Sequence, residues 1–405
     1  MSSLQDTPRS ERLHIGLFGK RNSGKSALLN ALTNQEVAVV SSVAGTTTDP
    51  VYKSMELHGI GPCVFIDTAG FDDEGKLGNL RIEQTLRAVE RTDIALIVCT
   101  DSNIEQEIQW SNRLKDKKIP IIWILNKSDI LENAEAEMLA IEQKTGQVPL
   151  LVSARLKQGI EPIRQSIQDK MPDESQQTSI LGKLVKSGDI IMLVMPQDIQ
   201  APKGRLILPQ VQTIRELLDR KCIVMSCTTD KLDETLRALA NPPQLIITDS
   251  QVFKTVYEKK PEATKLTSFS VLFARYKGDI DYFIQGANTI EQLTESSKVL
   301  IAEACTHAPL KEDIGRVKIP RLLRTRIGSG LQIDIVSGTD FPQDLSGYDL
   351  IIHCGACMFN RRHVLSRLAK AEKQGVPMTN YGITIAHLTG IIGRVTYPGQ
   401  NNSIR

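Results

Sequence analysis

The 405-residue chain has almost no net charge, because 49 Lys and Arg residues are balanced by 47 Asp and Glu residues. Such a balance provides no global field that would draw the protein to nucleic acid or to an anionic membrane. Aromatic residues make up only 4% of the sequence. RNA-binding surfaces are typically basic and carry aromatic side chains, so both scarcities argue against nucleic acid as a partner.

Long hydrophobic runs are also missing. No apolar stretch approaches the roughly 20 residues of a membrane span, and Met1 to Arg12 is polar and lacks the apolar core of a signal peptide. We therefore expect a cytoplasmic protein without a membrane partner, in which the seven cysteines do not form a disulfide framework. Four cysteines lie in apolar, strand-like runs and are expected to be core residues: Cys63, Cys99, Cys222 and Cys227.

Short apolar runs alternate with longer helical stretches from Leu13 to about Met171. This pattern predicts an α/β fold with a mainly parallel sheet covered on both faces. The strands are expected at Ile15 to Phe18, Cys63 to Ile66, Ile94 to Cys99, Ile121 to Leu125 and Pro149 to Val152. The polar segment Pro172 to Gln177 reads as a linker, so the first domain is predicted to span residues 1–172.

Two smaller α/β domains are predicted after the linker, at residues 178–264 and 266–405. The middle domain shows no phosphate loop, metal-ligand spacing or paired carboxylates, and we expect it to mediate self-association or to act as a spacer. Its strands are predicted at Ile190 to Val194, Cys222 to Met225 and Leu245 to Ile247; those of the last domain at Lys298 to Ala302, Leu331 to Val336, Leu350 to Ile352 and Pro377 to Asn380.

A phosphate-binding loop is predicted between the first strand and a helix. The segment Gly19-Lys-Arg-Asn-Ser-Gly-Lys-Ser26 matches the P-loop pattern, in which glycines let backbone N–H groups approach phosphates. Lys25 is expected to bridge the β- and γ-phosphates, and Ser26 is expected to bind Mg²⁺. The cofactor-binding residues predicted in this loop are Gly19, Asn22, Ser23, Gly24, Lys25 and Ser26.

Further motifs of a nucleotide site follow in order. Asp67-Thr-Ala-Gly70 follows a predicted strand and brings a carboxylate close to Mg²⁺ and a glycine N–H close to the γ-phosphate. In Asn126-Lys-Ser-Asp129, the Asp129 carboxylate can accept from N1–H and the 2-amino group of guanine, a donor pair that adenine lacks. GTP is therefore the predicted nucleotide. The base pocket is expected to comprise Asn126, Lys127, Asp129, Ser153 and Ala154.

This ordered set resembles the translation-factor-like GTPases, specifically the branch related to Era and TrmE. The resemblance covers about the first 170 residues and implies a GTPase that converts GTP to GDP and phosphate with Mg²⁺. Ala44 to Asp49 is similar to the first switch of this branch, with Thr47 as the Mg²⁺ ligand and Thr46 and Thr48 as neighbouring alternatives. Asn22 is similar to the asparagine with which potassium-activated members hold K⁺. The residues expected to act in catalysis are Lys25, Thr47, Asp67 and Gly70.

Phe71 follows Gly70 at the position where Ras-type GTPases place a glutamine that orients water. A phenylalanine side chain has no hydrogen-bonding group, so unaided hydrolysis is expected to be slow. The glycine-punctuated stretch Asp72 to Gly78 is expected to be a second switch that responds to the γ-phosphate.

Cysteine and histidine residues gather in two short segments, Cys305-Thr-His307 and His353-Cys-Gly-Ala-Cys357. Each follows a predicted strand, at the sheet edge where open α/β sheets place their crevices. A helix is expected to begin near Cys357. Zinc in a Cys3His site or a [4Fe–4S] cluster with one exchangeable ligand would suit three thiolates. A redox pair would explain neither Cys305 nor the histidines. Ligand count alone leaves zinc, iron–sulfur and non-metal roles open.

The two Cys/His segments, placed behind a TrmE-like GTPase region, resemble the HydF family of [FeFe]-hydrogenase maturation over the whole chain. The resemblance implies a homodimer formed by the middle domain and a C-terminal [4Fe–4S] cluster held by Cys305, Cys354 and Cys357. The fourth position is left to His307, His353, the nearby Glu303 or an exogenous ligand. The family further implies a scaffold that carries a diiron precursor, built with two radical-SAM maturases, to apo-[FeFe]-hydrogenase.

An RNA- or ribosome-assembly GTPase with a C-terminal structural zinc module is the alternative, and the near-neutral charge argues against it. Two further features lie near the Cys/His segments. Thr379-Asn-Tyr-Gly382 either lines the same crevice or is a strand-to-helix turn. A basic cluster either attracts an anionic precursor or forms a solvated or partner-facing surface; its members are Arg316, Lys318, Arg321, Arg324 and Arg326.

Overall fold

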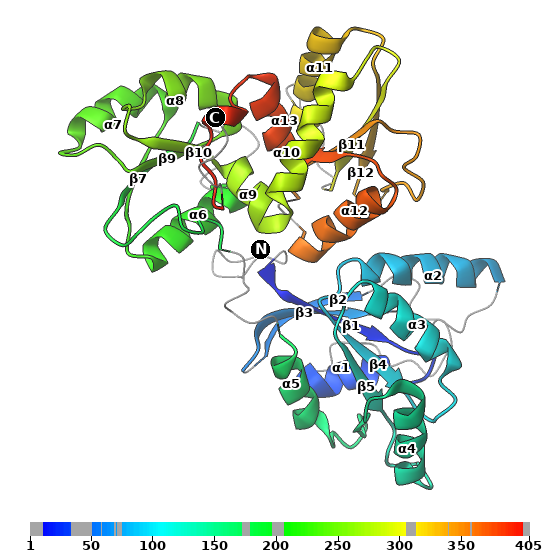
Figure 1. Ribbon diagram of the computed structural model, residues 1–405. Helices are drawn as coiled ribbons and strands as arrows, with labels where there is room; N and C mark the ends of the chain where they lie inside the picture. Colours follow the sequence, from blue (N-terminus) through cyan, green and yellow to red (C-terminus); the bar gives the residue numbers. More distant parts are fainter. Residues whose placement is uncertain are drawn as a thin grey trace. The chain divides into compact units, whose positions relative to one another are not determined.

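Figure 1 shows the protein as a computed structural model, in which the chain divides into two compact units, Met1–Gln176 and Gln177–Arg405. The first unit contains one six-stranded sheet, and the second contains two four-stranded sheets. The predicted fold class, a mainly parallel sheet followed by two smaller α/β sheets, is confirmed. The structure describes residues 11–33, 51–57, 59–68, 70, 75–171 (the backbone alone for 75–81), 179–196, 206–304, 313–338, 340–356 and 359–399.

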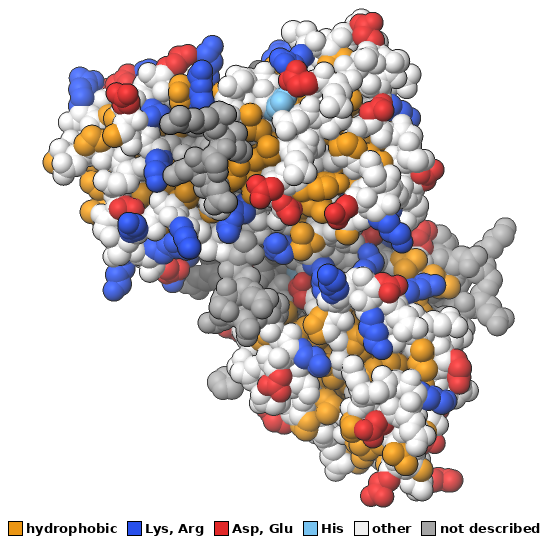
Figure 2. Space-filling model, viewed as in Figure 1, with side chains coloured by type: hydrophobic (Ala, Val, Ile, Leu, Met, Phe, Trp, Pro, Cys, Tyr) orange, Lys and Arg blue, Asp and Glu red, His pale blue; other side chains and the backbone are white. Residues whose placement is uncertain are grey.

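On the face shown in Figure 2, basic and acidic side chains are interspersed, as the even charge balance of the sequence leads one to expect. None of the helices in the described ranges combines the length and the apolar character needed to cross a membrane.

The first unit alternates strands and helices along the chain. Its sheet has the strand order β2-β3-β1-β4-β5-β6, and every neighbouring pair is parallel except β2 and β3. The elements are β1 (Leu13–Phe18), α1 (Lys25–Thr33), β2 (Val51–Leu57), β3 (Gly61–Asp67), α2 (Gly75–Val89), β4 (Ile94–Cys99), α3 (Glu105–Asp116), β5 (Ile121–Leu125), α4 (Ala134–Thr145), β6 (Leu150–Leu151) and α5 (Ile160–Asp169).

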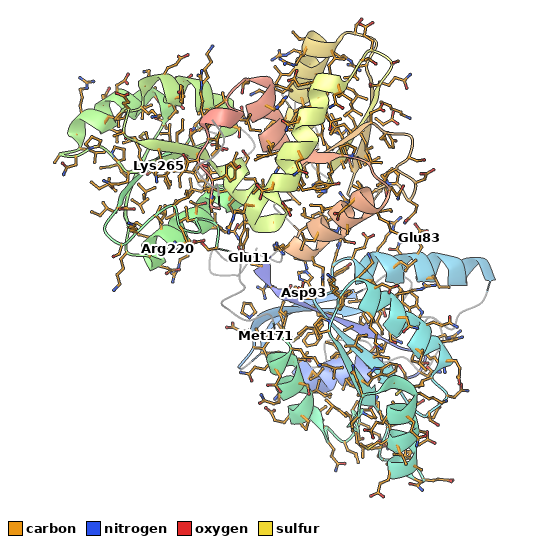
Figure 3. All side chains as sticks on the ribbon, viewed as in Figure 1. Glu11, Glu83, Asp93, Met171, Arg220 and Lys265 are labelled. Carbon is orange, nitrogen blue, oxygen red and sulfur yellow. The ribbon has the colours of Figure 1, made fainter. Side chains whose placement is uncertain are left out.

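Strand β4 shows why the central strands of this sheet are continuous apolar runs in the sequence. All six of its residues are buried, and successive side chains point to opposite faces. Ile94, Leu96 and Val98 belong to the core shared with α1 and α5, whereas Ala95, Ile97 and Cys99 belong to the core shared with α3 and α4. Asp93, labelled in Figure 3, accepts a hydrogen bond from the backbone N–H of His14 at 2.9 Å and so links the starts of β4 and β1.

The antiparallel strand β2 is absent from the sequence-based prediction. It mixes polar and apolar residues without a continuous apolar run, and only Leu57 is buried. Because β2 lies at the edge of the sheet, it lacks the buried apolar run by which the central strands were recognised.

The second unit carries two all-parallel sheets, with strand orders β10-β9-β7-β8 and β12-β11-β13-β14. The first sheet is built with β7 (Ile190–Val194), α6 (Leu208–Asp219), β8 (Ile223–Cys227), α7 (Leu232–Ala238), β9 (Leu245–Thr248), α8 (Phe253–Lys259), β10 (Lys265–Ser268) and α9 (Phe269–Lys277). The second is built with α10 (Ile280–Asn288), β11 (Lys298–Glu303), the π-helical turn η6 (Ile314–Lys318), α11 (Ile319–Ile327), β12 (Gln332–Ser337), β13 (Leu350–His353), α12 (Arg361–Lys373), β14 (Met378–Asn380) and α13 (Tyr381–Leu388).

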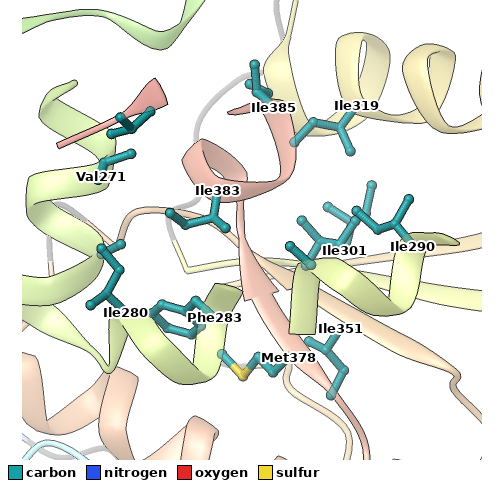
Figure 4. Packing of buried hydrophobic residues seen from close by; sticks show 14 of the residues in the cluster. Val271, Ile280, Phe283, Ile290, Ile301, Ile319, Ile351, Met378, Ile383 and Ile385 are labelled. Atoms are coloured by element: carbon teal, nitrogen blue, oxygen red, sulfur yellow. The ribbon is translucent and has the colours of Figure 1, made fainter. Parts of the chain in front are cut away.

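One hydrophobic core joins the two sheets of the second unit. It contains Met192 and Ile246 from the first sheet together with Ile301, Ile351 and other residues of the second. Figure 4 shows Phe283 of α10 close to Met378 of β14 in this core. Helix α10 crosses β14 so closely that a Cβ atom on Gly286 would lie 2.1 Å from the carbonyl oxygen of Met378. Only glycine permits this approach.

Strand β10 extends the first of these sheets beyond residue 264, where the sequence placed the end of the middle domain. Its residues pair in parallel with β9, from Lys265 with Leu245 to Ser268 with Thr248. The short sequence Lys-Leu-Thr-Ser has a single large apolar residue, and so β10 was not recognised from the sequence.

Candidate functional site

The predicted phosphate loop follows β1 and opens helix α1. Lys25 is buried, and its Nζ atom donates to the carbonyl oxygens of Gly19 and Lys20, each at 2.8 Å. Ser26 Oγ donates to Asp67 Oδ2 at 2.6 Å. Burial raises the pKa of the Asp67 carboxyl, while the hydrogen bond from Ser26 and the charge of Lys25 partly offset that rise. The proposed Mg²⁺ groups from β3 and α1 are therefore in direct contact.

Asn126 braces three loops of this site. Its Nδ2 atom donates to the carbonyl of Ser23 at 2.9 Å, and its Oδ1 atom accepts from the backbone N–H of Ala154 at 3.1 Å. A Cβ atom on Gly24, where φ is +90°, would lie 2.3 Å from Asn126 Nδ2. The glycine is needed both for its backbone conformation and for the space that the asparagine occupies.

Asp129 and Ser153 meet at the other end of the predicted base pocket. Ser153 Oγ donates to Asp129 Oδ1 at 2.6 Å and accepts from the backbone N–H of Leu156 at 3.1 Å. This hydrogen bond is the main reason why the pKa of Asp129 lies below its usual value. Lys127, which has a left-handed backbone with φ of 64°, lies in the same loop. The carboxylate is thus charged and oriented before any base arrives.

A buried carboxylate next to the phosphate loop is not recognisable from sequence. Glu107 of α3 is 1% exposed, and one of its oxygens lies 3.4 Å from Nζ of the P-loop residue Lys20. Lys20 also donates to the carbonyl of Asn103. Burial raises the pKa of Glu107. A glutamate in the first turn of a polar helix looks like an ordinary solvated residue, and so no sequence signal identifies it.

Some predicted residues are only partly covered by the structure. Asn22 adopts a left-handed conformation with φ of 57°, which asparagine tolerates better than most residues. Gly70 is described and buried. The predicted first-switch ligand Thr47, Phe71 and the start of the predicted second switch lie outside the described residues.

The carboxyl edge of the C-terminal sheet holds Cys354, directly after β13. Its Sγ atom accepts backbone N–H groups from Ala304 at 2.9 Å and from Ala356 at 3.4 Å. Ala356 has a positive φ of 48°, a left-handed conformation that is unusual for alanine. The loop is therefore held in a shape that directs two N–H dipoles at one sulfur atom, which stabilises a thiolate.

Lys277 holds this loop from the end of helix α9. The residue is 2% exposed, and its Nζ atom donates to the carbonyls of Ala356 at 3.0 Å and Phe359 at 2.7 Å. These two carbonyls flank positions 357 and 358. A buried ammonium group from one sheet's last helix thus fixes the loop that follows a strand of the other sheet.

Two of the candidate fourth ligands have other partners. His353 is fully buried; its Nε2 atom lies 3.0 Å from a guanidinium nitrogen of Arg367, and its Nδ1 atom lies 2.6 Å from the carbonyl of Cys354. Burial, followed by the charge of Arg367, lowers the pKa of His353 to about 3. The Glu303 carboxylate accepts from Arg316 and from Ser337 Oγ, each with a shortest contact of 2.9 Å.

The predicted basic cluster is partly neutralised. Arg316 pairs with Glu303 at 2.9 Å, and Arg326 pairs with Glu291 at 2.7 Å. An open groove of about 510 Å³ runs along η6 and α11 and is lined by Arg316, Val317, Pro320, Arg321, Arg324 and Thr325.

Helix α12 begins later than the sequence suggests. The expected start near Cys357 is wrong, because the Asn360 side chain caps the helix by accepting from the backbone N–H of His363 at 3.3 Å, and the helix starts at Arg361. Phe359 and Asn360 therefore precede the helix, and the Phe359 carbonyl is one of the two that Lys277 binds.

Cys305, His307 and Cys357 lie outside the described residues. Within the described ranges, no group of three or more His, Cys, Asp or Glu side chains is arranged to hold a metal ion. The proposed cysteine cluster is therefore represented by Cys354 alone. The core cysteines agree with expectation: Cys63, Cys99 and Cys222 are buried, and Cys227 is half-buried.

Models of two protein families match the second unit of the chain, and a third matches most of the first unit. Residues 180–278 match the Hydrogen maturase F dimerization domain, and residues 281–398 match the Hydrogen maturase F tetramerization domain. The two matches together span more than half of the chain. The chain belongs to the hydrogen maturase F (HydF) family. Residues 14–127 match a family described as 50S ribosome-binding GTPase, which covers the P-loop and the Asp67 motif. The family predicted from the sequence is confirmed.

Curated relatives of this HydF-family chain share its N-terminal region. GTPase Der of Wolinella succinogenes is 35% identical over 200 residues, which are 46% of this chain and 41% of Der. The tRNA modification GTPase MnmE of Hamiltonella defensa is 34% identical over 168 residues, which are 40% of this chain and 36% of MnmE. The chain thus spans about two fifths of the length of these relatives.

Solved structures similar to this HydF-family chain include Aquifex aeolicus Era with bound GDP and AlF4⁻ (TM-score 0.36, 19% identity, 56% of this chain and 98% of that chain). The G domain of the Thermotoga maritima FeoB iron transporter has a TM-score of 0.31 and 18% identity, and the match covers 40% of this chain and all of that domain.

We predict that guanine recognition depends on the Ser153–Asp129 pair. Asp129→Ala should weaken GTP binding at least about 100-fold, since two hydrogen bonds to a charged group are lost. Ser153→Ala should weaken it about tenfold, because the carboxylate remains but loses the bond that orients it and lowers its pKa. Titration with a fluorescent GDP analogue measures both.

The control for this pair is Ser111→Ala, which removes a buried hydroxyl of the same unit that donates to the carbonyl of Ile108. It should bind nucleotide like the wild type. Unchanged affinity in Ser153→Ala would contradict a role for the serine.

We also predict that Lys277 stabilises the second unit of this HydF-family protein. Lys277→Met should lower the free energy of unfolding by about 2 kcal/mol, because two buried carbonyls lose a charged donor. In a unit of this size that corresponds to a calorimetric midpoint lower by roughly 4–8 °C. Lys265→Met, at the exposed start of β10 (Figure 3), is the control and should change the midpoint by less than about 1 °C. Equal midpoints for the two variants would show that the Lys277 contacts contribute nothing.

Proposed function

We propose that this protein is a GTP-hydrolysing iron–sulfur scaffold of hydrogenase maturation. In this proposal the first unit binds and hydrolyses GTP, and the second unit holds a [4Fe–4S] cluster and carries a diiron precursor to apo-[FeFe]-hydrogenase. The observation that supports it most is the succession of a GTPase-family match and two hydrogen maturase F matches along one chain. The scaffold would work as a homodimer or larger oligomer with two radical-SAM maturases as partners in a cytoplasmic setting.

The proposed GTP chemistry follows from the contacts at β1, β3 and β5. Lys25 would bind the β- and γ-phosphates, and Ser26 would ligate Mg²⁺ beside Asp67, which it already contacts at 2.6 Å. Asn126 would hold the phosphate loop and the base-pocket loop in register, while Asp129 reads guanine. Gly70 N–H and Thr47 remain the proposed contacts of the γ-phosphate and Mg²⁺.

The chemistry around Cys354 fits a cluster ligand. A thiolate sulfur that accepts two backbone N–H groups is stabilised as an anion, and hydrogen bonds to sulfur are a known means of tuning iron–sulfur sites. We propose that Cys305, Cys354 and Cys357 hold the cluster. When bound, the cluster would offer one iron with an exchangeable ligand for the cargo.

The fourth ligand of the proposed cluster is best assigned to His307 or an exogenous group. His353 is held between Arg367 and the carbonyl of Cys354. If His353 bound the cluster, the buried guanidinium of Arg367 would lose this hydrogen-bond acceptor. Using Glu303 would break its contacts with Arg316 and Ser337. Both rearrangements cost hydrogen bonds to charged groups.

Cluster binding can be tested by anaerobic purification, iron and sulfide analysis and EPR of the reduced protein. We expect about four irons for each wild-type chain. Cys354→Ala should lose most of this iron and keep wild-type GTP affinity, because the residues proposed for the two functions lie in separate units.

The control for cluster loss is Cys227→Ala, a half-buried cysteine of the other sheet in the same unit, which should retain the iron. Stoichiometric zinc without iron in the wild type would replace this proposal with the structural-zinc alternative.

K⁺ activation can be tested at Asn22. If its side-chain amide holds K⁺ beside the phosphates, hydrolysis should be about tenfold or more faster in K⁺ than in Na⁺. Asn22→Gly should remove this difference and keep nucleotide affinity, because glycine accepts the local φ of 57°. Asn22→Asp retains an oxygen ligand at the same position and should keep the preference for K⁺. A K⁺ effect that persists in Asn22→Gly would mean that the asparagine serves only the turn.

A further inference from the structure

The hydroxyl of Tyr381 is a polar group without a role in anything described above. It is inaccessible to solvent and has no hydrogen-bond partner among the described residues. A buried hydroxyl left unpaired destabilises a folded protein, whereas phenylalanine at the same position would avoid the cost. Such a group requires an explanation.

Tyr381 lies at the carboxyl edge of the C-terminal sheet. It follows β14 directly, and the strand register pairs His353 of β13 with Asn380 and with Ala302 of β11. Cys354 is the next residue after β13. Tyr381 and Cys354 therefore leave neighbouring strands at the same level of the sheet edge.

The tyrosine side chain extends from β14 toward β11. A Cβ atom on Gly315 would lie 2.0 Å from the Tyr381 hydroxyl oxygen and 3.0 Å from Glu303 Oε1, and Glu303 is the last residue of β11. The Tyr381 hydroxyl thus lies close to the last residue of β11, and β13, which ends directly before Cys354, is the strand between β11 and β14. Glycine at position 315 leaves the space that the hydroxyl occupies.

The charged groups around this hydroxyl have partners of their own. The Glu303 carboxylate is bound by Arg316 and Ser337, and Asp313 accepts from the backbone N–H groups of Gly315 and Arg316 at 2.9 and 2.8 Å. Burial, followed by the negative charges of Cys354, Glu303 and Asp313, raises the pKa of Tyr381, while Arg316 lowers it. The hydroxyl keeps its proton and can donate.

We propose that the Tyr381 hydroxyl donates a hydrogen bond to the metal cluster bound at Cys354, either to a sulfur atom or to the anionic ligand of the open iron. This inference rests on the proposed cluster and adds a positioning residue to it. The donor stabilises the extra negative charge of the reduced cluster more than that of the oxidised one, and so it raises the reduction potential. A hydroxyl that lacks a partner among the described residues gains one when the cluster is present.

Tyr381→Phe tests the inference because it removes only the hydroxyl. The matched control is Tyr282→Phe. The hydroxyl of Tyr282 donates to the carbonyl of Val376 at 3.4 Å, near the opposite end of β14. Full-length proteins are compared in two states: the metal-free form by calorimetry, and the anaerobically reconstituted form by iron and sulfide content, EPR and an EPR-monitored redox titration.

In Tyr381→Phe the metal-free unit should melt no lower than the wild type, and the iron and sulfide contents should be unchanged. The equilibrium constant for reducing the cluster should fall about tenfold, the size expected for one hydrogen bond to a charged acceptor. Tyr282→Phe should titrate like the wild type.

The results that would contradict the proposed function differ from those that would contradict this inference alone. A wild-type protein without iron removes the proposed function and this inference together. A wild type with a cluster, combined with a Tyr381→Phe variant of identical potential and EPR spectrum, removes this inference alone. A lower melting point of metal-free Tyr381→Phe would show that the hydroxyl has a structural partner, and would also overturn it.

Discussion

Parallel strands that are buried on both faces can place polar, functional side chains only at their ends. This constraint determines where the proposed site lies in each sheet. The middle residues of such strands must be apolar, as in β4, where all six side chains are buried. Polar groups therefore collect in the loops that follow the carboxyl ends. In the first unit these loops bring Ser26 to Asp67 and Asn126 to Ser23. In the C-terminal sheet they place Cys354 and Tyr381 beside each other on neighbouring strands.

Loops at a sheet edge have to be held in shape, and buried polar side chains do this in both units. Asn126 uses its amide to connect the phosphate loop with the base-pocket loop. Lys277 uses its ammonium group to bind two carbonyls of the loop after β13. Each side chain is 1–2% exposed, so its hydrogen bonds do not compete with water and an unpaired partner would be costly. Local geometry thus depends on single residues that are distant in sequence from the loops they hold.

Elements with a strong apolar pattern could be predicted, and those without one could not. The predicted bounds of β4 and β5 agree with the structure residue for residue, because both strands are continuous apolar runs between turns. Strand β2 was missed because it is an edge strand with one buried residue, and β10 because it has a single large apolar side chain. The apolar pattern predicts an earlier start for α12 because it does not reveal that Asn360 caps the helix.

The sequence by itself determined the class of the protein. The order of the GTPase motifs and the spacing of the Cys/His segments are properties of residue identity along the chain, and they led to the HydF family before any geometry was known. Only the tertiary structure decided which polar groups face one another: Glu107 with Lys20, Lys277 with the loop after β13, and Arg367 with His353. The physical reason is that strand register and helix crossing set these contacts. They join residues between 14 and 87 positions apart, and no local pattern encodes such a pairing.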